Sequence, residues 1–317
     1  MENCKHFRTL KTGSDDAGRR LDRVLRKALP DHSLSLIHRL LRQGKVRLNG
    51  KSASPADRIP PGAVIHVVIP ESFTEEEKNT SKTPYNSVVK NSSLPEILWR
   101  GAGIIVFNKP PGLATHGEDS LDALVKAWLG GKLPPSLSFK PGPLHRLDKP
   151  TSGAVAFSET IEGARLFSRL LRERKAAKTY LAIVEGRMTG EAVWQDELVR
   201  DSNAGKTFAS GKPGAKKALT AVKALASNGS HTLIEARIVT GRTHQIRAQA
   251  AAHGHPLAGD RKYGGHDLPG GRGFLLHAWK LDLGGHLPGF PHPLIAPLPA
   301  SFQSRISALW GTIKLPR

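Results

Sequence analysis

Charged side chains that could take part in catalysis are concentrated in the block HRLDKPTSG, at residues 145–153. The carboxylate of this block, Asp148, is flanked by Arg146 and Lys149 in a segment that ends in proline and glycine. Positive charges nearby favour the ionised form of a carboxylate, so Asp148 would remain available as an anion. A turn or capping residue is the more frequent role for a loop aspartate, and this block alone does not exclude it.

A second charged block, GRTHQIR at residues 241–247, follows the strand-like run LIEARIV. It places cations and hydrogen-bond donors where a loop ends, which suits contact with phosphate or carboxylate groups. His253, His255 and Asp260 come next, but without a helical HExxH pattern or thiolates, so we expect no metal site. No GxGxxG signature lies between a strand and a helix, so a dinucleotide site has no support.

The whole chain is strongly basic, with 47 Lys and Arg against 27 Asp and Glu in 317 residues and a net charge of +20. Such an excess favours a polyanionic partner, because each neutralised phosphate releases a counterion, but charge alone leaves RNA, DNA and anionic membranes open. The single cysteine, Cys4, excludes an internal disulfide framework. The sequence shows neither a signal peptide nor a long apolar run, so we expect a soluble, cytoplasmic protein, with a monomer as the default.

The elements of residues 1–70 are predicted from apolar spacing. Helical periodicity covers residues 18–29 and again 35–43, where Ser33 or Ser35 would cap the second helix. The segment KVRLNGKS then predicts a hairpin at Asn49-Gly50, and the strand AVIHVVIP closes the module. This arrangement resembles the S-four-like RNA-binding domain, although a charged helix face by itself could simply be solvated. The residues expected to contact RNA here are Arg39, Arg42, Lys45 and Arg47.

The remainder of the chain divides at a polar stretch. Residues 71–96 are rich in Ser, Thr and Asn and predict a flexible linker. From residue 97 to 317, strand-like runs alternate with a helix-like EGARLFSRLLRERK and with loops rich in glycine and proline. This is an α+β pattern without regular βαβ repetition, and it predicts three segments, 1–70, 71–96 and 97–317.

Four ordered motifs in residues 97–317 resemble the RluA family of pseudouridine synthases. HRLDKPTSG is similar to the family signature, IIVFNKPPGLATHG to its leading strand and loop, and KTYLAIVEG to a following strand. TGRTHQIRAQAAAHGHPLAGDRKYGG, followed by LLHAWKLDL, resembles the third block. The resemblance implies a catalytic domain with a mixed, largely antiparallel sheet, preceded by the small S-four-like domain.

The resemblance also implies roles for individual residues. Asp148 would be the catalytic aspartate, Tyr180 would pack on the target base and could assist at its carbon 5, and Arg247 would pair with the aspartate. Leu275 or Leu276 would supply an apolar wall, although each of these side chains, taken alone, could be structural. The other residues expected to bind substrate are Arg146, Leu147, Thr151, Arg242, Thr243, His244 and Gln245.

The implied reaction isomerises uridine to pseudouridine: the bond between ring nitrogen and sugar breaks, and the base reconnects through carbon 5. Because no electron or group is gained, we expect no cofactor and no metal. Asp148 could attack the anomeric carbon as a nucleophile or remove the 2′ hydrogen of the sugar, and the sequence leaves both routes open. Tyr180, or a water that it positions, is the candidate base for the proton at carbon 5.

The expected partner is ribosomal RNA, either 23S rRNA or a precursor of the large subunit. The segment SLIHRLLRQGKVRLNGK resembles the RluC subgroup more than the RluD subgroup. A transfer RNA pseudouridine synthase and a non-catalytic RNA-binding protein of ribosome assembly are the alternatives. The linker would let the first module raise the local concentration on rRNA without setting the register of the active site.

Overall fold

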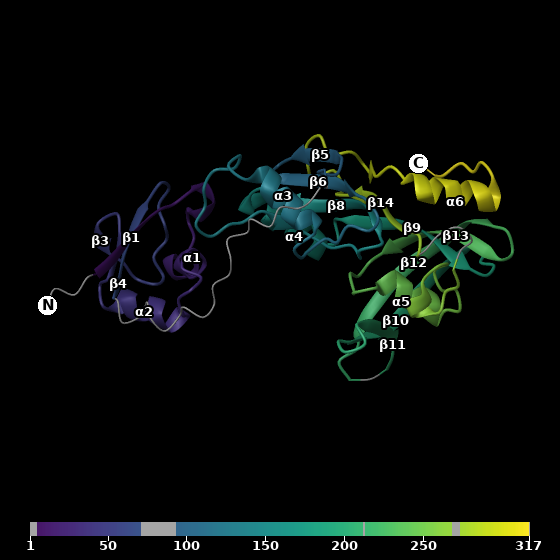
Figure 1. Ribbon diagram of the computed structural model, residues 1–317, viewed down its shortest axis with the longest axis horizontal. Coiled ribbons are helices and arrows are strands. Elements are labelled where there is room, and N and C mark those ends of the chain that lie inside the picture. Colours follow the sequence, from purple (N-terminus) through teal and green to yellow (C-terminus); the bar gives the residue numbers. More distant parts are fainter. Residues whose placement is uncertain (1–4, 71–92, 212, 268–272, 317) are drawn as a thin grey trace. The chain divides into compact units, whose positions relative to one another are not determined.

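The computed structural model describes residues 5–70, 93–211, 213–267 and 273–316. Most of the predicted linker, residues 71–92, therefore lies outside the described residues. The chain in Figure 1 divides into two compact units. The first comprises residues 1–90, 126–141 and 159–162, and the second comprises residues 91–125, 142–158 and 163–317.

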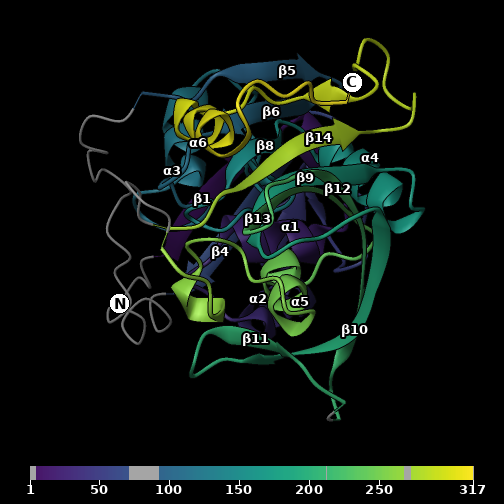
Figure 2. The same cartoon turned by 90° about the vertical axis from the view of Figure 1, so that its right-hand side faces the viewer.

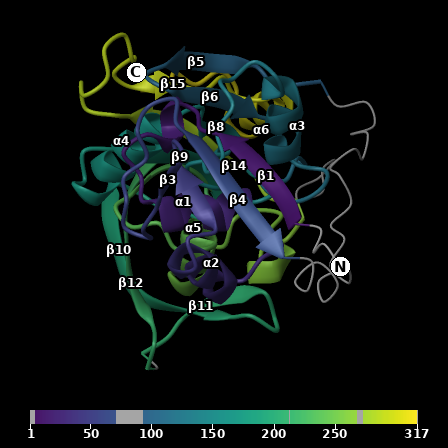
Figure 3. The same cartoon turned by 90° about the vertical axis from the view of Figure 1, so that its left-hand side faces the viewer.

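The first unit contains a small antiparallel sheet and two helices. Its strands follow the spatial order β1-β4-β2-β3, and β1 pairs with β4 along its whole length, as Figure 3 shows. The elements are β1 (Lys5–Lys11), α1 (Leu21–Ala28), α2 (Leu34–Arg42), β2 (Val46–Leu48), β3 (Lys51–Ser52) and β4 (Val64–Pro70).

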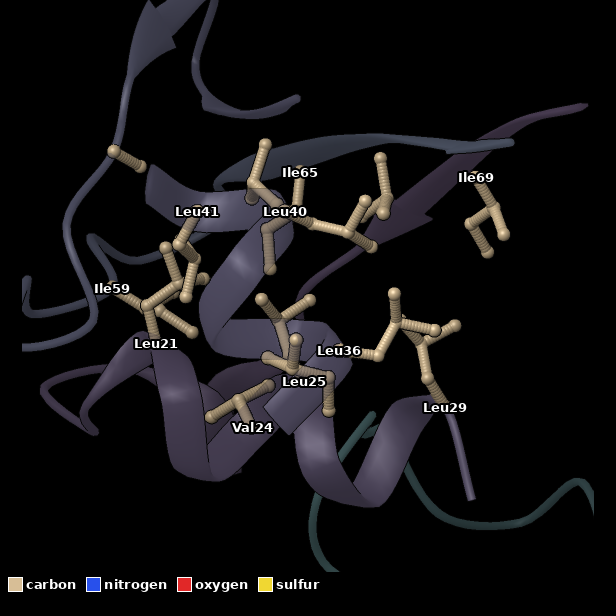
Figure 4. Packing of buried hydrophobic residues seen from close by; sticks show 14 of the residues in the cluster. Leu21, Val24, Leu25, Leu29, Leu36, Leu40, Leu41, Ile59, Ile65 and Ile69 are labelled. Carbon is tan, nitrogen blue, oxygen red and sulfur yellow. The ribbon is translucent and has the colours of Figure 1, made fainter. Parts of the chain in front are cut away.

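Local interactions explain these elements. Ser33 caps α2, because its hydroxyl accepts a hydrogen bond from the backbone N–H of Leu36 at 3.2 Å. Asn49 and Gly50 both have positive φ angles, 49° and 80°, as a two-residue hairpin turn requires. The predicted helices and hairpin are thus confirmed, and the apolar faces of α1 and α2 pack together in the core shown in Figure 4.

A segment from later in the chain also belongs to this unit. Asp16, at the end of the short 3₁₀ helix Ser14–Asp16, is fully buried. Its carboxylate accepts hydrogen bonds from the Ser136 hydroxyl at 2.9 Å and from the Leu137 backbone N–H at 2.8 Å. The Leu137 side chain packs against the apolar core of the unit. Residues 126–141 are therefore part of how the first unit is built.

The second unit is organised by one large sheet. Within the described residues it has eleven strands, and the main path runs β11-β10-β12-β13-β9-β14-β8-β6-β5. All pairs are antiparallel except β14 with β8, which confirms the mixed, largely antiparallel α+β fold. The strands are β5 (Ile97–Gly101), β6 (Ile104–Lys109), β7 (Gly142–Pro143), β8 (Ser152–Ser158), β9 (Ala177–Glu185), β10 (Glu191–Asp201), β11 (Lys206–Ala209), β12 (Lys216–Ser227), β13 (His231–Ile238), β14 (Leu276–Asp282) and β15 (Leu294–Ile295).

Helices pack around this sheet. They are α4 (Ile161–Arg172), α5 (Gln245–Ala252) and α6 (Ala300–Trp310), together with α3 (Leu121–Leu129), whose residues are divided between the two units. Helix α5 contacts β10 and β11, as Figure 2 shows. It begins within the block GRTHQIR, which from the sequence was expected only as the end of a loop. No helix in the described part of the chain is long and apolar enough to cross a membrane.

The central strands form the rigid part of the second unit. Every residue of β8 is buried, and so is most of β9, because neighbouring elements cover both faces of the sheet. Phe107 of β6 and Phe157 of β8 meet edge to face with ring centroids 5.5 Å apart. The loop that precedes β8 carries Asp148, so a tightly packed strand fixes the end of that loop.

Candidate active site

Asp148 belongs to a charged network of three side chains, in which the guanidinium of Arg247 lies between the carboxylates of Asp148 and Asp260. Nη1 of Arg247 donates to Oδ2 of Asp148 at 3.0 Å. The other side of the same guanidinium binds Asp260 through two bonds, from Nε at 2.6 Å and from Nη2 at 2.8 Å. A bidentate pair of this kind fixes the plane of the guanidinium, so Asp260 orients Arg247 toward Asp148.

The surroundings of Arg247 keep its charge in place. Its side chain is buried, and its guanidinium lies over the rings of Phe274 at 4.2 Å and Tyr263 at 4.8 Å. Burial opposes the charged form, but the bonds to Asp260 and Asp148 outweigh it and raise the pKa of Arg247. The arginine is a fixed cation beside the carboxylate.

The loop that carries Asp148 is fixed to the motif NKPPG by a buried lysine. The ammonium of Lys109 donates to the backbone carbonyls of Pro110 at 3.0 Å, Leu113 at 2.7 Å and Lys149 at 3.2 Å. Burial lowers the pKa of Lys109 to about 8, although the charge of Asp148 acts in the opposite direction. Lys109 therefore joins two of the sequence motifs through main-chain contacts.

A glycine brings the next strand close to the site. Gly153 has a φ angle of 108°, and a Cβ added there would lie 2.3 Å from the backbone oxygen of Ala278. Only glycine fits this approach of β8 to β14. The close pairing places Leu276 of β14 beside the pocket that Asp148 lines.

Tyr180 lies on β9 and lines the same space as Asp148. Its side chain is almost wholly buried, and burial together with the charge of Asp148 raises the pKa of its phenol well above the ordinary value. The free protein therefore holds Tyr180 as a neutral phenol. In this state it can stack on a base and donate a hydrogen bond, but it cannot remove a proton as a phenolate.

His244 also lies close to Asp148 and lines the same two spaces. Its Nε2 lies 3.7 Å from Oδ2 of Asp148, and its Nδ1 lies 2.9 Å from the hydroxyl of Tyr263. Burial lowers the pKa of His244, the nearby Asp148 partly restores it, and Arg247 lowers it further. The ring is thus neutral at neutral pH. A φ angle of 53° at this position lets His244 begin helix α5 directly at the site.

The space around Asp148 has two parts. A cleft of about 620 Å³ is lined by Asp148, Tyr180 and the loop of residues 239–244. A smaller pocket of about 70 Å³ shares Asp148 and Tyr180 and adds Thr151, Arg247 and other side chains. The predicted substrate residues that line at least one of these spaces are Arg146, Leu147, Thr151, Arg242, Thr243, His244, Gln245 and Leu276. Leu275 does not line either; it lines a separate cleft beside α6.

Several residues of the site were not predicted from the sequence. Asp260 was considered only as a possible metal ligand, whereas it anchors Arg247; His253 is 3.2 Å from Asp196. Tyr263 was part of a quoted motif without a role. The spacing of 13 residues between Arg247 and Asp260 carries no helical or strand signal, because a turn lies between them. Within the described residues no group of three or more acids, histidines and cysteines gathers as metal ligands, and the absence of a metal stays a prediction.

The four cations predicted to bind RNA lie in the first unit. Arg39 and Arg42 belong to α2, Lys45 follows it, and Arg47 lies on β2. The three arginines are exposed and Lys45 is half-buried. They therefore form a basic surface over one helix and the strand that follows it.

Comparison with known proteins agrees with this arrangement. A family described as RNA pseudouridylate synthase matches residues 103–252, and an S4 domain matches residues 19–65. A solved structure, human RNA pseudouridylate synthase domain containing 4, superposes with a TM-score of 0.54 at 27% identity, covering 67% of this chain and 92% of that one.

Curated relatives extend over most of the sequence. Ribosomal large subunit pseudouridine synthase D of Neisseria meningitidis is 32% identical over 308 residues, which are 92% of this chain and 79% of the relative. Ribosomal large subunit pseudouridine synthase C of Escherichia coli is 32% identical over 254 residues, 79% and 78% of the two chains. The equal identities do not distinguish the C and D groups. The chain belongs to the RNA pseudouridylate synthase family, as its four ordered motifs predict, and it carries an S4 domain before the synthase region.

Proposed function

We propose that the protein isomerises specific uridines to pseudouridine in large-subunit ribosomal RNA, acting as a cytoplasmic monomer without a cofactor. The observation that carries the proposal is the contact between Asp148 and Arg247 at 3.0 Å, in a space that Tyr180 also lines. The names of the relatives, which are synthases of the ribosomal large subunit, support this choice of substrate.

The geometry supports a division of work among the three residues. Asp148 is the reacting carboxylate, either as nucleophile at the anomeric carbon or as base at the 2′ position. Arg247 holds the carboxylate in one orientation and balances its charge. Since the pKa of Tyr180 is raised, the neutral phenol favours the alternative in which Tyr180 stacks on the base and positions a water that takes the proton from carbon 5.

The target uridine must leave its stack to reach Asp148. Base flipping costs a few kcal/mol and is least costly in loops or in incompletely folded RNA. The basic surface of the first unit and the cations of the cleft would supply the binding energy. The protein would therefore act most readily on RNA that is still assembling into the large subunit.

The experiment that tests the proposal maps pseudouridine by carbodiimide labelling and primer extension. Unmodified large-subunit rRNA is incubated with the wild-type protein and with Asp148→Asn, and transfer RNA is treated in parallel. New stops in rRNA with the wild type alone would support the proposal, and their positions would distinguish a C-type from a D-type target. Stops in transfer RNA only would reject the rRNA assignment. RNA binding without stops in either would reject the enzymatic one.

A further inference from the structure

The cleft beside Asp148 is lined by more cations than the chemistry at Asp148 uses. Asp148 is the only acid among the residues that line its described walls. The lining cations are Arg146, Arg174, Lys178, Arg237 and Arg242. A concave surface with five cations and one acid has the charge of an anion-binding site.

Lys178 is the least solvated of these cations. It lies on β9, two residues before Tyr180, and successive alternate residues of a strand face the same side, about 6.7 Å apart. Its side chain is half-buried, and burial alone lowers the pKa of its ammonium. A Cβ added at Gly241 would lie 3.9 Å from its Nζ, so the ammonium reaches the loop that borders the cleft.

The ammonium of Lys178 has no hydrogen bond or ion pair among the described residues. Its neighbour His145 does not help, because burial and the charge of Lys178 lower the pKa of His145 to about 3 and leave its ring neutral. A cation taken out of water is costly unless an anion accompanies it. The position would therefore be stabilised by a ligand that brings negative charge into the cleft.

We propose that Lys178, in the cleft that the loop of residues 239–244 also lines, binds a phosphate of the RNA strand next to the uridine that enters the pocket at Asp148. This inference rests on the proposed function and names a contact for the same substrate. Ile238 pairs with Lys178 in the sheet, so Ile238, and not Arg237, shares the face of Lys178 and Tyr180. Lys178 and Tyr180 line one cleft, so a nucleotide can place its base at Tyr180 and its backbone at Lys178.

This contact would do more than add affinity. Phosphate contacts fix the register of a protein on nucleic acid, whereas base contacts read the sequence. Lys178 and Tyr180 share a rigid, buried strand, so a phosphate held by the lysine fixes which nucleotide reaches the tyrosine. Lys178 would thereby select the target uridine by the position of that uridine along the RNA, relative to the bound phosphate.

Binding measurements test the proposal without turnover. Full-length Asp148→Asn protein is titrated with a short single-stranded oligouridylate at several salt concentrations, with and without Lys178→Gln. Each phosphate contact to a single strand contributes a slope of about 0.7 in log Kd against log salt. We expect Lys178→Gln to reduce the slope by about that amount and to weaken binding about tenfold at low salt. Lys178→Arg should keep the slope.

The matched control is Lys223→Gln. Lys223 is also a sheet lysine, but it is exposed and pairs with Glu191 at 2.8 Å. Equal slopes for Lys178→Gln and Lys223→Gln would overturn the proposal. If Lys178→Gln fails to fold, shown by a lost thermal transition, Lys178→Met replaces it, since it keeps an apolar stem of similar length without the charge, and an unchanged slope there overturns the proposal as well.

Kinetics with the wild-type background give a second readout. For the rRNA that the wild type modifies, Lys178→Gln should raise KM about tenfold and leave kcat within about threefold. A lower kcat with an unchanged KM would assign the lysine to the chemistry and contradict the phosphate contact. Failure of the proposed function is separate, because it appears as absent pseudouridine with the wild type, while the salt slopes are measured without any reaction.

Discussion

The two basic regions of the molecule differ in how their cations are held. In the first unit, Arg42 and Arg47 are exposed on α2 and β2. In the second unit, Arg247 is buried, paired with two acids and covered by aromatic rings. Exposed cations keep their side-chain freedom and are screened by salt, whereas buried ones have a single orientation.

The difference indicates that the two regions affect different properties: exposed cations affect the affinity for RNA, and the buried arginine affects the position of the reacting carboxylate. An exposed basic surface attracts any polyanion, and its contribution falls as salt is added. A fixed guanidinium contributes little to long-range attraction, but it sets the position of the reacting carboxylate, where displacement by about 1 Å costs on the order of a hundredfold in rate. Each of the following changes should therefore affect either KM or kcat predominantly.

The largest effect is expected at Asp260. Asp260→Asn removes one charge of the buried pair and leaves Arg247 with a weaker anchor, so kcat should fall about a hundredfold with little change in KM. The change should also lower the free energy of unfolding by about 3 kcal/mol. Single-turnover kinetics and denaturant unfolding measure the two effects. A variant with normal kcat and lower stability would show that Asp260 only supports the fold.

Tyr263→Phe should also lower kcat, but by less than Asp260→Asn does, because it acts on the surroundings of the buried Arg247. It keeps the ring over which Arg247 lies, but it removes the hydroxyl that bonds His244 and accepts from the backbone N–H of Thr207 at 2.9 Å. Loss of these bonds should lower kcat about fivefold, because His244 loses its fixed orientation near Asp148. The measurement is kcat at saturating RNA. An effect confined to KM would contradict the role of Tyr263 in orienting His244.

The exposed cations of the first unit should affect KM and not kcat. Removing two of them in Arg42→Gln/Arg47→Gln should raise KM about threefold at physiological salt and leave kcat unchanged. The control is Arg23→Gln/Arg26→Gln, which removes the same charge from exposed positions of α1. If both pairs raise KM equally, net charge and not the surface around α2 attracts the RNA. A difference that persists at high salt would argue against an electrostatic contact.

The smallest effect concerns the buried cation Lys109, whose pKa is lowered to about 8 from 10.5. Since its folded pKa lies below its unfolded one, the unfolded chain binds the proton more tightly, and this group makes the fold more stable as pH rises from about 8 to 10.5. Asp148 partly opposes the shift, so Asp148→Asn should lower the pKa of Lys109 further. NMR titration of the lysine measures both values. An unchanged or higher pKa in the variant would contradict the placement of the two charges.

Parts of this arrangement could be predicted from the sequence because their signals are local. The helices around Leu25 and Leu40 repeat apolar residues with helical spacing, and the Asn49-Gly50 turn depends on two residues only. The motifs around Asp148 and Tyr180 are contiguous, so a resemblance finds them directly. Their roles in the reaction stay predictions until they are tested.

Other parts depend on contacts between distant residues and leave no local pattern. Strand β10 is mostly exposed, so it lacks the apolar alternation from which a strand is predicted. The choice between Leu275 and Leu276 depends on the face that β14 turns toward the pocket, and only Leu276 lines it. Asp260 reaches Arg247 because the chain turns between them, and the spacing of the two residues matches neither a helical nor a strand repeat.

The contacts of Asp16 have a consequence for the order in which the protein is made. The chain emerges from the ribosome with its N-terminus first, so residues 5–70 emerge well before Ser136 and Leu137. These two residues donate hydrogen bonds to the Asp16 carboxylate, and Leu137 packs against the core of the first unit. Until then the Asp16 carboxylate keeps the bond from the Gly13 backbone N–H but lacks those from residues 136–138, and the apolar core lacks the contact with Leu137. The RNA-binding unit should reach full stability only when about half of the chain has been synthesised. A nascent chain arrested near residue 100 should therefore be cleaved by protease in this unit faster than one arrested near residue 200.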